Sequence, residues 1–304
     1  VLYYRFVRSL RNRGVSIRSF TNFFENQIID KALHKGMREF FPAARNVGYS
    51  GYSPVTIYYC SFPVQKEFDC GVLPDVLALP GEGYRSYVDQ FVNGLETVVV
   101  PHLRGSTIRG YMKLKKGVSN FKVLMALPHT PSDWWYFVDL AFRIEADFGD
   151  RVDVLIKPHP IVDLSYLYDL MKKYGHSDQI KLVDGDILKL VADSSLLIGV
   201  ASGVLVESIC LGVPVAVLRI PRKFMYNPIP PRIPGSLWMQ CDDKDMVVCY
   251  IKRLLDEARE KESDQEAISG NILDLFYEPI SRQTLDRLLP GGVSHENRER
   301  IERG

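Results

Sequence analysis

Residues that could bind an anionic group follow a predicted buried strand in the stretch Lys157-Pro158-His159-Pro160. The two prolines restrict the backbone on either side of His159, so its imidazole has few positions to adopt. An imidazole can donate a hydrogen bond to a phosphate oxygen or to a base edge, and Lys157 adds positive charge. The stretch therefore predicts a phosphate-binding loop. The alternative is a plain loop whose prolines only end the strand.

A second candidate is Ala201-Ser202-Gly203, a turn of small residues between a predicted buried strand and a short apolar helix. Small side chains let a ligand approach the backbone, the helix N-terminus favours an anion, and the Ser202 hydroxyl adds a donor. Glu207 lies one turn into the helix, where burying a carboxylate is costly unless it is paired. A ribose diol would satisfy Glu207. A salt bridge to an arginine such as Arg219 is the alternative.

A third strand-to-helix crossing is predicted at Leu127-Pro128-His129-Thr130-Pro131-Ser132. Thr130 or Ser132 is expected to cap the helix that follows, because short hydroxyl side chains accept hydrogen bonds from the first amides of a helix. Both residues remain candidates for a phosphate contact. His129 is the lesser candidate beside His159.

In the first half of the chain, Glu25 is the candidate for acid–base chemistry. It follows Phe23 and Phe24 at a predicted strand-to-helix turn, where the two aromatic rings would shield it from water. A carboxylate so placed could accept the proton of an attacking hydroxyl. The alternative is a carboxylate that interacts with the helix dipole. Further candidates for the same site are Asn26, Asp30, Arg38 and Gly48-Tyr49.

The elements that position these residues alternate in the second half of the chain. Buried strands are predicted at 121–127, 152–157, 180–183, 196–200 and 213–218, with helices between them. This alternation is typical of a parallel sheet covered by helices on both faces. Ligands of such sheets bind beyond the carboxyl ends of the strands, where all three loops described above are expected to lie.

The first half is predicted to be a second α/β domain. Its expected elements are strands at 15–20, 56–60, 72–79 and 97–100, helices at 22–41 and 84–93, and a turn at 48–54. The basic, glycine-containing stretch 105–120 is interpreted as a linker. The predicted organisation is a first α/β domain over 1–115, expected to be incomplete, a Rossmann-like domain over 120–285, and a polar tail over 286–304.

Composition excludes several classes of protein. With 304 residues, 46% hydrophobic and 25% charged, the chain is typical of a globular protein. A net charge of +1 provides no overall field to recruit nucleic acid. The five cysteines form no Cys-x-x-Cys pair, which fits a reducing compartment, and no acidic metal-binding motif follows a strand. We therefore expect a cytoplasmic protein without a bound metal or other cofactor.

Contact with a membrane is an open question in the sequence. The longest apolar stretch, 196–220, is interrupted by Ser202, Glu207 and Arg219, so it is not a membrane span. Residues 1–20 hold five arginines among aromatic and aliphatic residues. They predict either an exposed helix face or a patch that touches acidic lipid or a phosphorylated acceptor, which would place the protein at the periphery of the inner membrane.

Taken together, these motifs resemble a known family. Lys157-Pro158-His159-Pro160, Ser202-Gly203 with Glu207, and Gly212-Val213-Pro214 resemble the donor half of GT-B glycosyltransferases of bacterial capsule and lipopolysaccharide synthesis. The Kdo, polysialic acid and glycerophosphate transferases are the suspected relatives. The stretch from Phe24 to Asp30, with Arg38 and Gly48-Tyr49, resembles the acceptor half of the same proteins.

The resemblance implies a metal-independent transferase with two Rossmann-like domains. Its donor would be a CMP-, CDP- or UDP-linked sugar, bound as substrate, and its acceptor a hydroxyl of a glycan or a lipid-linked glycan. It implies that His159, Ser202 and Gly203 hold phosphate, that Glu207 holds ribose and that Glu25 is the catalytic carboxylate. Two alternatives stay open: an enzyme resembling sugar-nucleotide 2-epimerases, whose acid–base groups would include Glu25 and His102, and a non-catalytic nucleotide-sugar-binding or partner domain.

Overall fold

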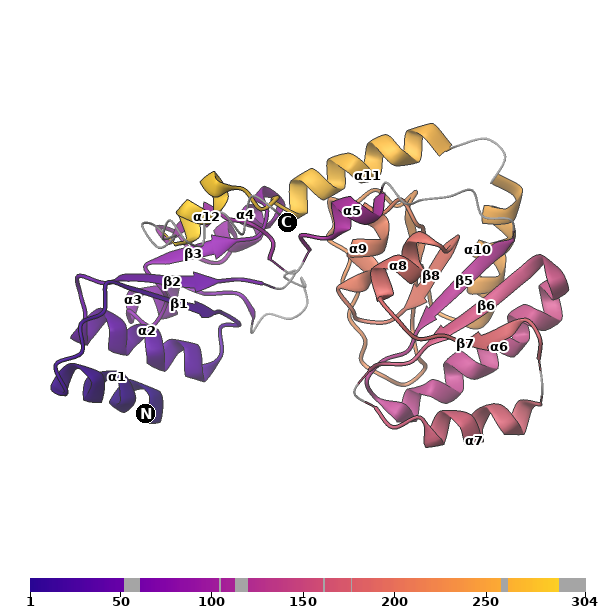
Figure 1. The fold of residues 1–304 in the computed structure, drawn as a ribbon, viewed down its shortest axis with the longest axis horizontal. Helices are drawn as coiled ribbons and strands as arrows, with labels where there is room; N and C mark the ends of the chain where they lie inside the picture. The colour runs from indigo at the N-terminus through magenta and orange to yellow at the C-terminus, as the bar shows by residue number, and fades with distance from the viewer. Residues whose placement is uncertain are drawn as a thin grey trace. The chain divides into compact units, whose positions relative to one another are not determined.

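The computed structural model describes residues 1–51, 61–103, 105–112, 120–160, 162–175, 177–257 and 262–289 (Figure 1). The chain forms two compact units. The first comprises Val1–Ser106 with Leu273–Gly304, and the second comprises Thr107–Ile272. Each unit contains one sheet of parallel strands, which confirms the predicted α/β class with two Rossmann-like domains. No helix among the described residues is long and apolar enough to cross a membrane.

The sheet of the first unit has the order β1-β2-β3-β4, and its strands are all parallel. They are β1 (Ser19–Phe23), β2 (Arg45–Tyr49), β3 (Val76–Leu79) and β4 (Glu96–Val99). The prediction missed β2, because the glycine and polar residues near Tyr49 are typical of a turn. In the fold this segment is internal and buried, since β1 and β3 pair with its two edges. The predicted strand at 56–60 lies outside the described residues.

The helices of the first unit pack closely, as α1 on α2 shows (Figure 1). A Cβ atom on Gly36 of α2 would lie 2.9 Å from the Cβ of Val7, so glycine at this position lets α1 approach. Ile17, predicted to lie in a strand at 15–20, instead packs against the apolar side chains around Val7, where α1 meets α2. The strand β1 begins only at Ser19. The helices are α1 (Leu2–Asn12), α2 (Ile28–Phe40), α3 (Gln65–Asp69), the 3-10 helix η2 (Glu82–Tyr84), α4 (Arg85–Asp89) and α12 (Arg282–Leu288).

The C-terminal segment returns to the first unit. The helix α11 (Glu262–Phe276) ends where Phe276 packs on Tyr84, and a Cβ on Gly81 would lie only 2.6 Å from the Phe276 backbone. The helix α12 then lies by β4, with Leu288 buried. The second unit thus begins and ends earlier than predicted. Residues 286–288 belong to α12, with Leu288 buried, rather than to a polar tail, and residues 290–304 lie outside the described part of the chain.

The second unit has a six-stranded parallel sheet in the order β10-β9-β8-β5-β6-β7. The chain starts at the centre with β5 (Phe121–Ala126) and adds β6 (Val152–Lys157) and β7 (Ile180–Leu182) on one side. It then returns to place β8 (Leu196–Gly199) on the other side of β5, followed by β9 (Val215–Leu218) and β10 (Trp238–Cys241). The order of strands therefore reverses between β5 and β8.

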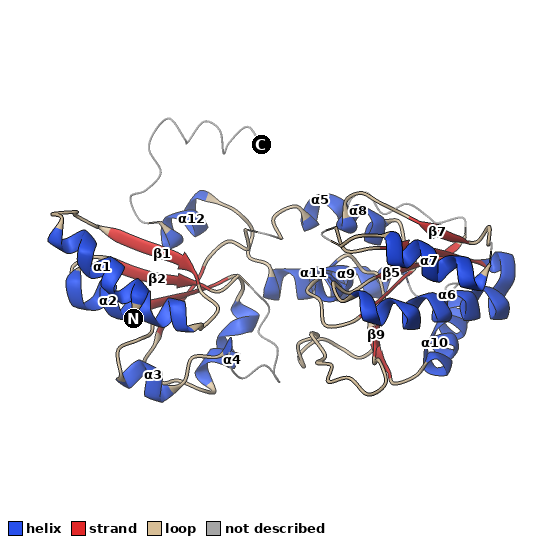
Figure 2. Ribbon diagram, turned by 90° about the horizontal axis from the view of Figure 1, so that it is seen from below, coloured by secondary structure: helices blue, strands red, loops and turns tan. Residues whose placement is uncertain are grey.

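Helices cover both faces of this sheet (Figures 1 and 2). The helices α6 (Trp134–Phe148), α7 (Ser165–Tyr174) and α10 (Lys244–Glu257) form one group, and α5 (Ile108–Met112), α8 (Ile187–Ala192) and α9 (Val204–Cys210) form the other. Short 3-10 turns, η3 (Pro131–Asp133) and η4 (Gly149–Arg151), flank α6. Val123 and Met125 of β5 pack in the core beneath α6, and their neighbour Leu124 is equally buried. Burial on both faces explains why the strands are continuously apolar.

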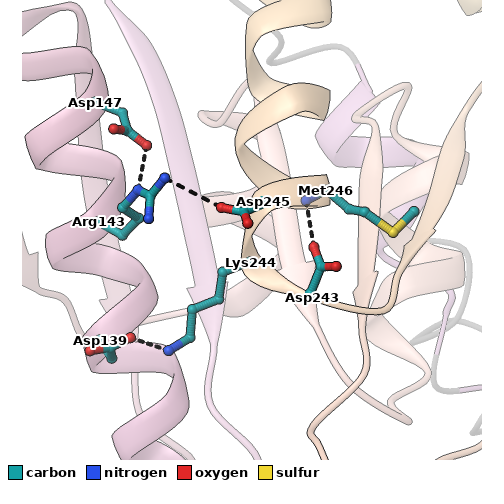
Figure 3. Close-up of polar contacts among 7 residues, drawn as sticks. All are labelled: Asp139, Arg143, Asp147, Asp243, Lys244, Asp245 and Met246. Atoms are coloured by element: carbon teal, nitrogen blue, oxygen red, sulfur yellow. Dashed lines mark hydrogen bonds and ion pairs between the residues drawn. The ribbon is translucent and has the colours of Figure 1, made fainter.

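Charged side chains join the surfaces of α6 and α10 (Figure 3). Arg143 contacts Asp147 of its own helix and Asp245 of α10, at 2.7 and 3.3 Å. Lys244 pairs with Asp139, and its ammonium lies 4.3 Å from the centre of the Tyr136 ring. Burial opposes ionisation of Asp139, but hydrogen bonds from Lys244 and Tyr174 lower its pKa overall. These contacts fix the start of α10 on the outside of the unit.

A histidine is buried in the first unit. His34 of α2 is fully buried between the rings of Phe20 and Phe24, and its Nδ1 lies 2.6 Å from Oδ1 of Asn46. The Asn46 amide nitrogen donates to the His34 carbonyl, so Oδ1 faces the imidazole and the proton belongs on Nδ1. Within the described part of the chain, the Nε2 atom has no hydrogen-bond partner. Burial lowers the pKa of His34 to about 4, although the Asn46 contact opposes this change.

We predict that His34 makes the first unit sensitive to acid. Unfolded chains protonate this side chain below about pH 6.5, whereas the folded chain resists protonation down to about pH 4. The free energy of unfolding should therefore fall by roughly 3 kcal/mol as the pH is lowered through this window. Urea titrations between pH 7 and 4 measure this fall, and His34→Gln should flatten it. An NMR titration in which His34 protonates near pH 6.5 in the folded protein would contradict the prediction.

Candidate functional site

The reversal of strand order makes the carboxyl edge of the second sheet the candidate site. After β5 the chain leaves toward one side of the sheet, and after β8 it leaves toward the other. Loops that diverge in this way leave a crevice between them, and ligands of open α/β sheets bind there. The loops after β5 and β8 are two of the three predicted by the motifs, and the third follows β6, the neighbour of β5.

The loop after β5 is held by Trp134, whose indole nitrogen donates to the Pro128 carbonyl at 2.8 Å. Thr130 stands at the N-cap of η3, yet its side chain makes no capping hydrogen bond. Ser132 donates to Asp133 and accepts a hydrogen bond from Lys223 at 3.4 Å. The expectation that Thr130 or Ser132 caps the helix is therefore wrong, because a 3-10 turn with Pro131 inside it precedes α6.

The loop after β6 brings His159 to the same edge. Its ring lies 6.3 Å from that of His129, so the β5 and β6 loops meet through two imidazoles. The Nδ1 atom of His159 is buried and has no hydrogen-bond partner among the described residues, which leaves capacity for a ligand. Pro160 is exposed.

Lys157 has a partner on the neighbouring strand. Its buried side chain donates to Asp184, just after β7, at 2.9 Å, and also reaches the carbonyl of Pro158 at 3.4 Å. The hydrogen bond from Lys157 lowers the pKa of Asp184. Lys157 therefore joins the carboxyl ends of β6 and β7. Asp184 partly neutralises the positive charge of Lys157, which the sequence analysis assigned to an anionic ligand.

The turn after β8 exposes Ser202 and Gly203. Gly203 has φ of −59° and ψ of −28°, a conformation that any residue adopts, and a Cβ atom there would meet nothing within 4 Å. Neither backbone strain nor packing therefore requires glycine at this position. Open space at a helix N-terminus on the sheet's carboxyl edge is compatible with the close approach of a ligand.

Glu207 is buried in α9, all of whose side chains are buried. Arg219, the partner that the sequence offered as the alternative for Glu207, contacts Asp242 at 3.3 Å. Glu207 and Arg109 both act on the buried thiol of Cys210. Burial raises the pKa of Cys210, Glu207 adds to this effect, and Arg109 opposes it. The sequence missed Arg109 because its helix α5 falls within the stretch interpreted as a linker.

The long loop after β9 is part of this edge and was not predicted. Lys223 pairs with Asp133 of the β5 loop, and the Tyr226 hydroxyl donates to the Ala201 carbonyl at 3.3 Å. Arg222 has a positive φ of 63°, and Phe224 is 81% exposed. The signal was available in the sequence, because the segment from Arg219 to Pro234, at the end of a predicted strand, is rich in prolines and basic residues.

In the first unit, the turn between β1 and α2 presents Glu25. The carboxylate of Asp30 accepts hydrogen bonds from the backbone nitrogens of Glu25 and Gln27, at 3.0 and 2.9 Å, and a third from the Asn22 amide. Asn26 adopts φ of 59° and donates to the Phe62 carbonyl at 2.8 Å. Asp30 and Asn26 thus build the turn, while the Glu25 side chain is half-buried at its surface.

The remaining first-unit candidates have structural partners. Arg38 pairs with Asp75 at 2.6 Å, and Tyr49 donates to the Pro101 carbonyl at 3.2 Å. His102 is buried, and its Nδ1 accepts from the Gly105 nitrogen at 2.7 Å. The two aromatic rings before Glu25 do not shield it as expected. Phe24 is turned into the core against His34, and Phe23 is 48% exposed.

The potential metal-binding side chains of the described residues do not form a recognisable metal site. Among the described residues, no three histidine, cysteine, aspartate or glutamate side chains come together as metal ligands would.

Comparison with known proteins defines the class of the fold. No family model and no curated protein matches the chain by sequence. Among solved structures, it is similar to UDP-GlcNAc 2-epimerases from Neisseria meningitidis and Methanocaldococcus jannaschii, with TM-scores of 0.59 and 0.56 and identities of 11% and 13%. A glycosyltransferase from Rickettsia africae gives a TM-score of 0.56 at 10% identity.

These alignments cover 90%, 89% and 90% of this chain and 76%, 78% and 76% of the three relatives, in the same order. The fold is therefore GT-B-like, with two Rossmann-like units. Both relatives classed as epimerases were crystallised with UDP-GlcNAc. The low identities establish the fold alone.

We predict that Gly203→Ala separates ligand binding from stability. The added methyl group meets no atom of the protein, so the free energy of unfolding should change by less than about 0.5 kcal/mol. It should nevertheless weaken the binding of inorganic pyrophosphate, measured by calorimetry, because it occupies the space a ligand would enter. Gly270→Ala in α11, where a Cβ would also meet nothing within 4 Å, is the control. Equal pyrophosphate affinity in both variants would remove Gly203 from the site.

Proposed function

We propose that this protein is a glycosyltransferase that takes a nucleotide-activated sugar as donor and a glycan or lipid-linked glycan hydroxyl as acceptor. The observation that carries the proposal is the convergence of the β5, β6 and β8 loops at the point where strand order reverses. In this GT-B-like fold, the same edge carries the His159 Nδ1 atom, which has no partner among the described residues, and the exposed Ser202 hydroxyl. Gly203 lies beside them with no protein atom where a Cβ would be. UDP-sugars are the first donors to test, because solved proteins of this fold bind them.

Within this site each side chain has a proposed task. His159 donates to a donor phosphate, and Ser202 with the Gly203 backbone holds the same group at the start of α9. Glu207 binds the ribose hydroxyls, for which it must exchange its present contacts. Thr130 and Ser132 line the β5 side, and Lys157 contributes mainly by holding the β6 loop through Asp184.

The proposed reaction needs electrostatic stabilisation and a base. The acceptor oxygen forms a bond to the anomeric carbon, and the bond from that carbon to the phosphate oxygen breaks with its electron pair on the phosphate. Fixed donors at the phosphate stabilise the charge that develops there. The hydroxyl proton passes to a carboxylate, which we propose to be Glu25, because Asp30 is committed to the turn that presents it.

The second candidate function is epimerisation of a nucleotide sugar, which the similar epimerase structures favour. Such an enzyme needs acid–base groups besides Glu25, and His102 was the other candidate. His102 is buried, accepts a backbone hydrogen bond and stacks on Tyr277, which suits a structural role. Incubation with UDP-GlcNAc distinguishes the two functions: epimerisation gives a new UDP-sugar without acceptor, whereas transfer releases UDP only with acceptor.

We predict that His159→Ala weakens UDP binding while the fold survives. Losing a hydrogen bond to a charged group costs about 1–3 kcal/mol, which corresponds to roughly 5- to 150-fold in Kd. Calorimetric titration with UDP measures the effect. His129→Ala, from the neighbouring ring, is the matched control and should have a smaller effect. If folded His159→Ala binds UDP as the wild type does, the assignment of His159 to the phosphate is wrong.

We predict that Glu25→Gln lowers turnover by about 10²- to 10⁴-fold, the usual contribution of a positioned base. The substitution keeps the shape of the side chain, and the turn is built by Asp30, so UDP affinity should stay near that of the wild type. Glu96→Gln is the control, because Glu96 is exposed at the amino end of β4 in the same sheet. A Glu25→Gln protein that retains full turnover would exclude Glu25 as the base.

A further inference from the structure

The helix α1 has two different faces. One face packs on α2 through Val7, with Tyr4 and Leu10 partly buried beside it. The other face exposes large apolar side chains: Leu2 is 75% exposed and Phe6 is 54% exposed. These two residues are four apart, so they lie one above the other on the helix surface. Their exposure is not needed for the fold, because Val7 and Leu10 already supply the contact with α2.

The segment that contains α1 carries unusual charge, and three of its arginines lie in the helix itself. Residues 1–20 contain no aspartate or glutamate and five arginines, all exposed: Arg5, Arg8, Arg11, Arg13 and Arg18. None of them forms an ion pair with a carboxylate in the described part of the chain. Arg11 lies over the Phe41 ring at 5.9 Å. The acidic group facing the helix from α2 is Glu39, which interacts with the Tyr4 hydroxyl.

We propose that α1 is a membrane-binding helix that lies in the interface of a bilayer containing anionic lipid. Arg5 lies three residues after Leu2, so it flanks the apolar pair and reaches headgroup phosphates while Leu2 and Phe6 enter the acyl boundary. Long arginine side chains extend toward headgroups in this way and keep their charge hydrated. Each arginine near an anionic surface adds to the attraction, and the absence of acidic residues in the segment removes repulsion.

The observations favour a lipid surface over other occupants. A second copy of this chain would bring two arginine-rich faces together, which repel each other. Nucleic acid would pair its phosphates with the arginines but would leave the exposed leucine without an apolar partner. The net charge of the whole chain is also only +1. The close contact of Val7 with Gly36 fixes α1 on α2, so membrane binding would anchor the first unit itself. This inference does not rest on the proposed transferase activity.

The test is flotation of the full chain with vesicles of phosphatidylcholine alone or with one-third phosphatidylglycerol. The wild type should float with the anionic vesicles only, and less so at high salt. Arg5→Gln with Arg8→Gln should reduce partitioning roughly 30-fold. Leu2→Ser with Phe6→Ser should reduce it at least about tenfold. Lys172→Gln with Lys173→Gln, which removes two exposed charges from α7, should leave it unchanged.

The proposal is overturned if the wild type does not float, or if the α7 control loses as much binding as the Arg5 and Arg8 variant. It is also overturned if the Leu2 and Phe6 variant binds fully, because the arginines would then bind the vesicles as they would any polyanion. Circular dichroism verifies that each variant is folded. As a second measurement, Phe6→Trp should show a blue-shifted emission with anionic vesicles if the side chain enters the lipid. UDP affinity measured on the same variants tests the donor site separately.

Discussion

In the second unit, every strand is hydrogen-bonded in parallel, and this constraint determines where chemistry is possible. Parallel neighbours require a crossover that returns the chain to the same end of the sheet, so all carboxyl ends meet at one edge. The chain begins the sheet at its centre with β5 and later returns to pair β8 with it. The loops that follow these two strands therefore leave toward opposite sides of the sheet. This pairing, together with that of β5 and β6, brings the loops that carry His159, Ser202 and Gly203 to one edge of the sheet.

Other contacts on the same edge serve to hold the loops. Lys157 joins the ends of β6 and β7 through Asp184, and Lys223 and Tyr226 tie the long β9 loop to the β5 and β8 loops. Of these residues, Lys157 is the one that the sequence analysis assigned to ligand binding, and its charge is instead shared with Asp184. The atoms left without a partner are then more informative than the charged ones, as Nδ1 of His159 shows.

The first unit follows the same logic at a smaller scale. Asp30 fixes the turn after β1 with three hydrogen bonds, and Asn26 accepts the left-handed conformation that this turn needs. The Tyr49 hydroxyl joins the end of β2 to the segment after β4, because it donates to Pro101 and accepts from the Leu103 nitrogen. Glu25 is thereby presented by a turn that hydrogen bonds hold in place. Beneath it, the uncharged His34 packs with Phe24, and the cost of charging it links the stability of the first unit to pH.

The sequence by itself determined the alternation of strands and helices in the second unit, and hence its fold class. Long apolar runs separated by helical periodicity are local signals, and the motifs at 157–160 and 201–203 could be placed at strand ends from them. Tertiary structure alone decided the rest. The strand β2 looks like a turn until β1 and β3 pair with it, and Lys157 looks free until β7 brings Asp184 beside it. The return of Phe276 and α12 to the first unit depends on close approach at Gly81. Pairings between distant segments depend on which surfaces meet after folding, and local sequence periodicity does not predict them.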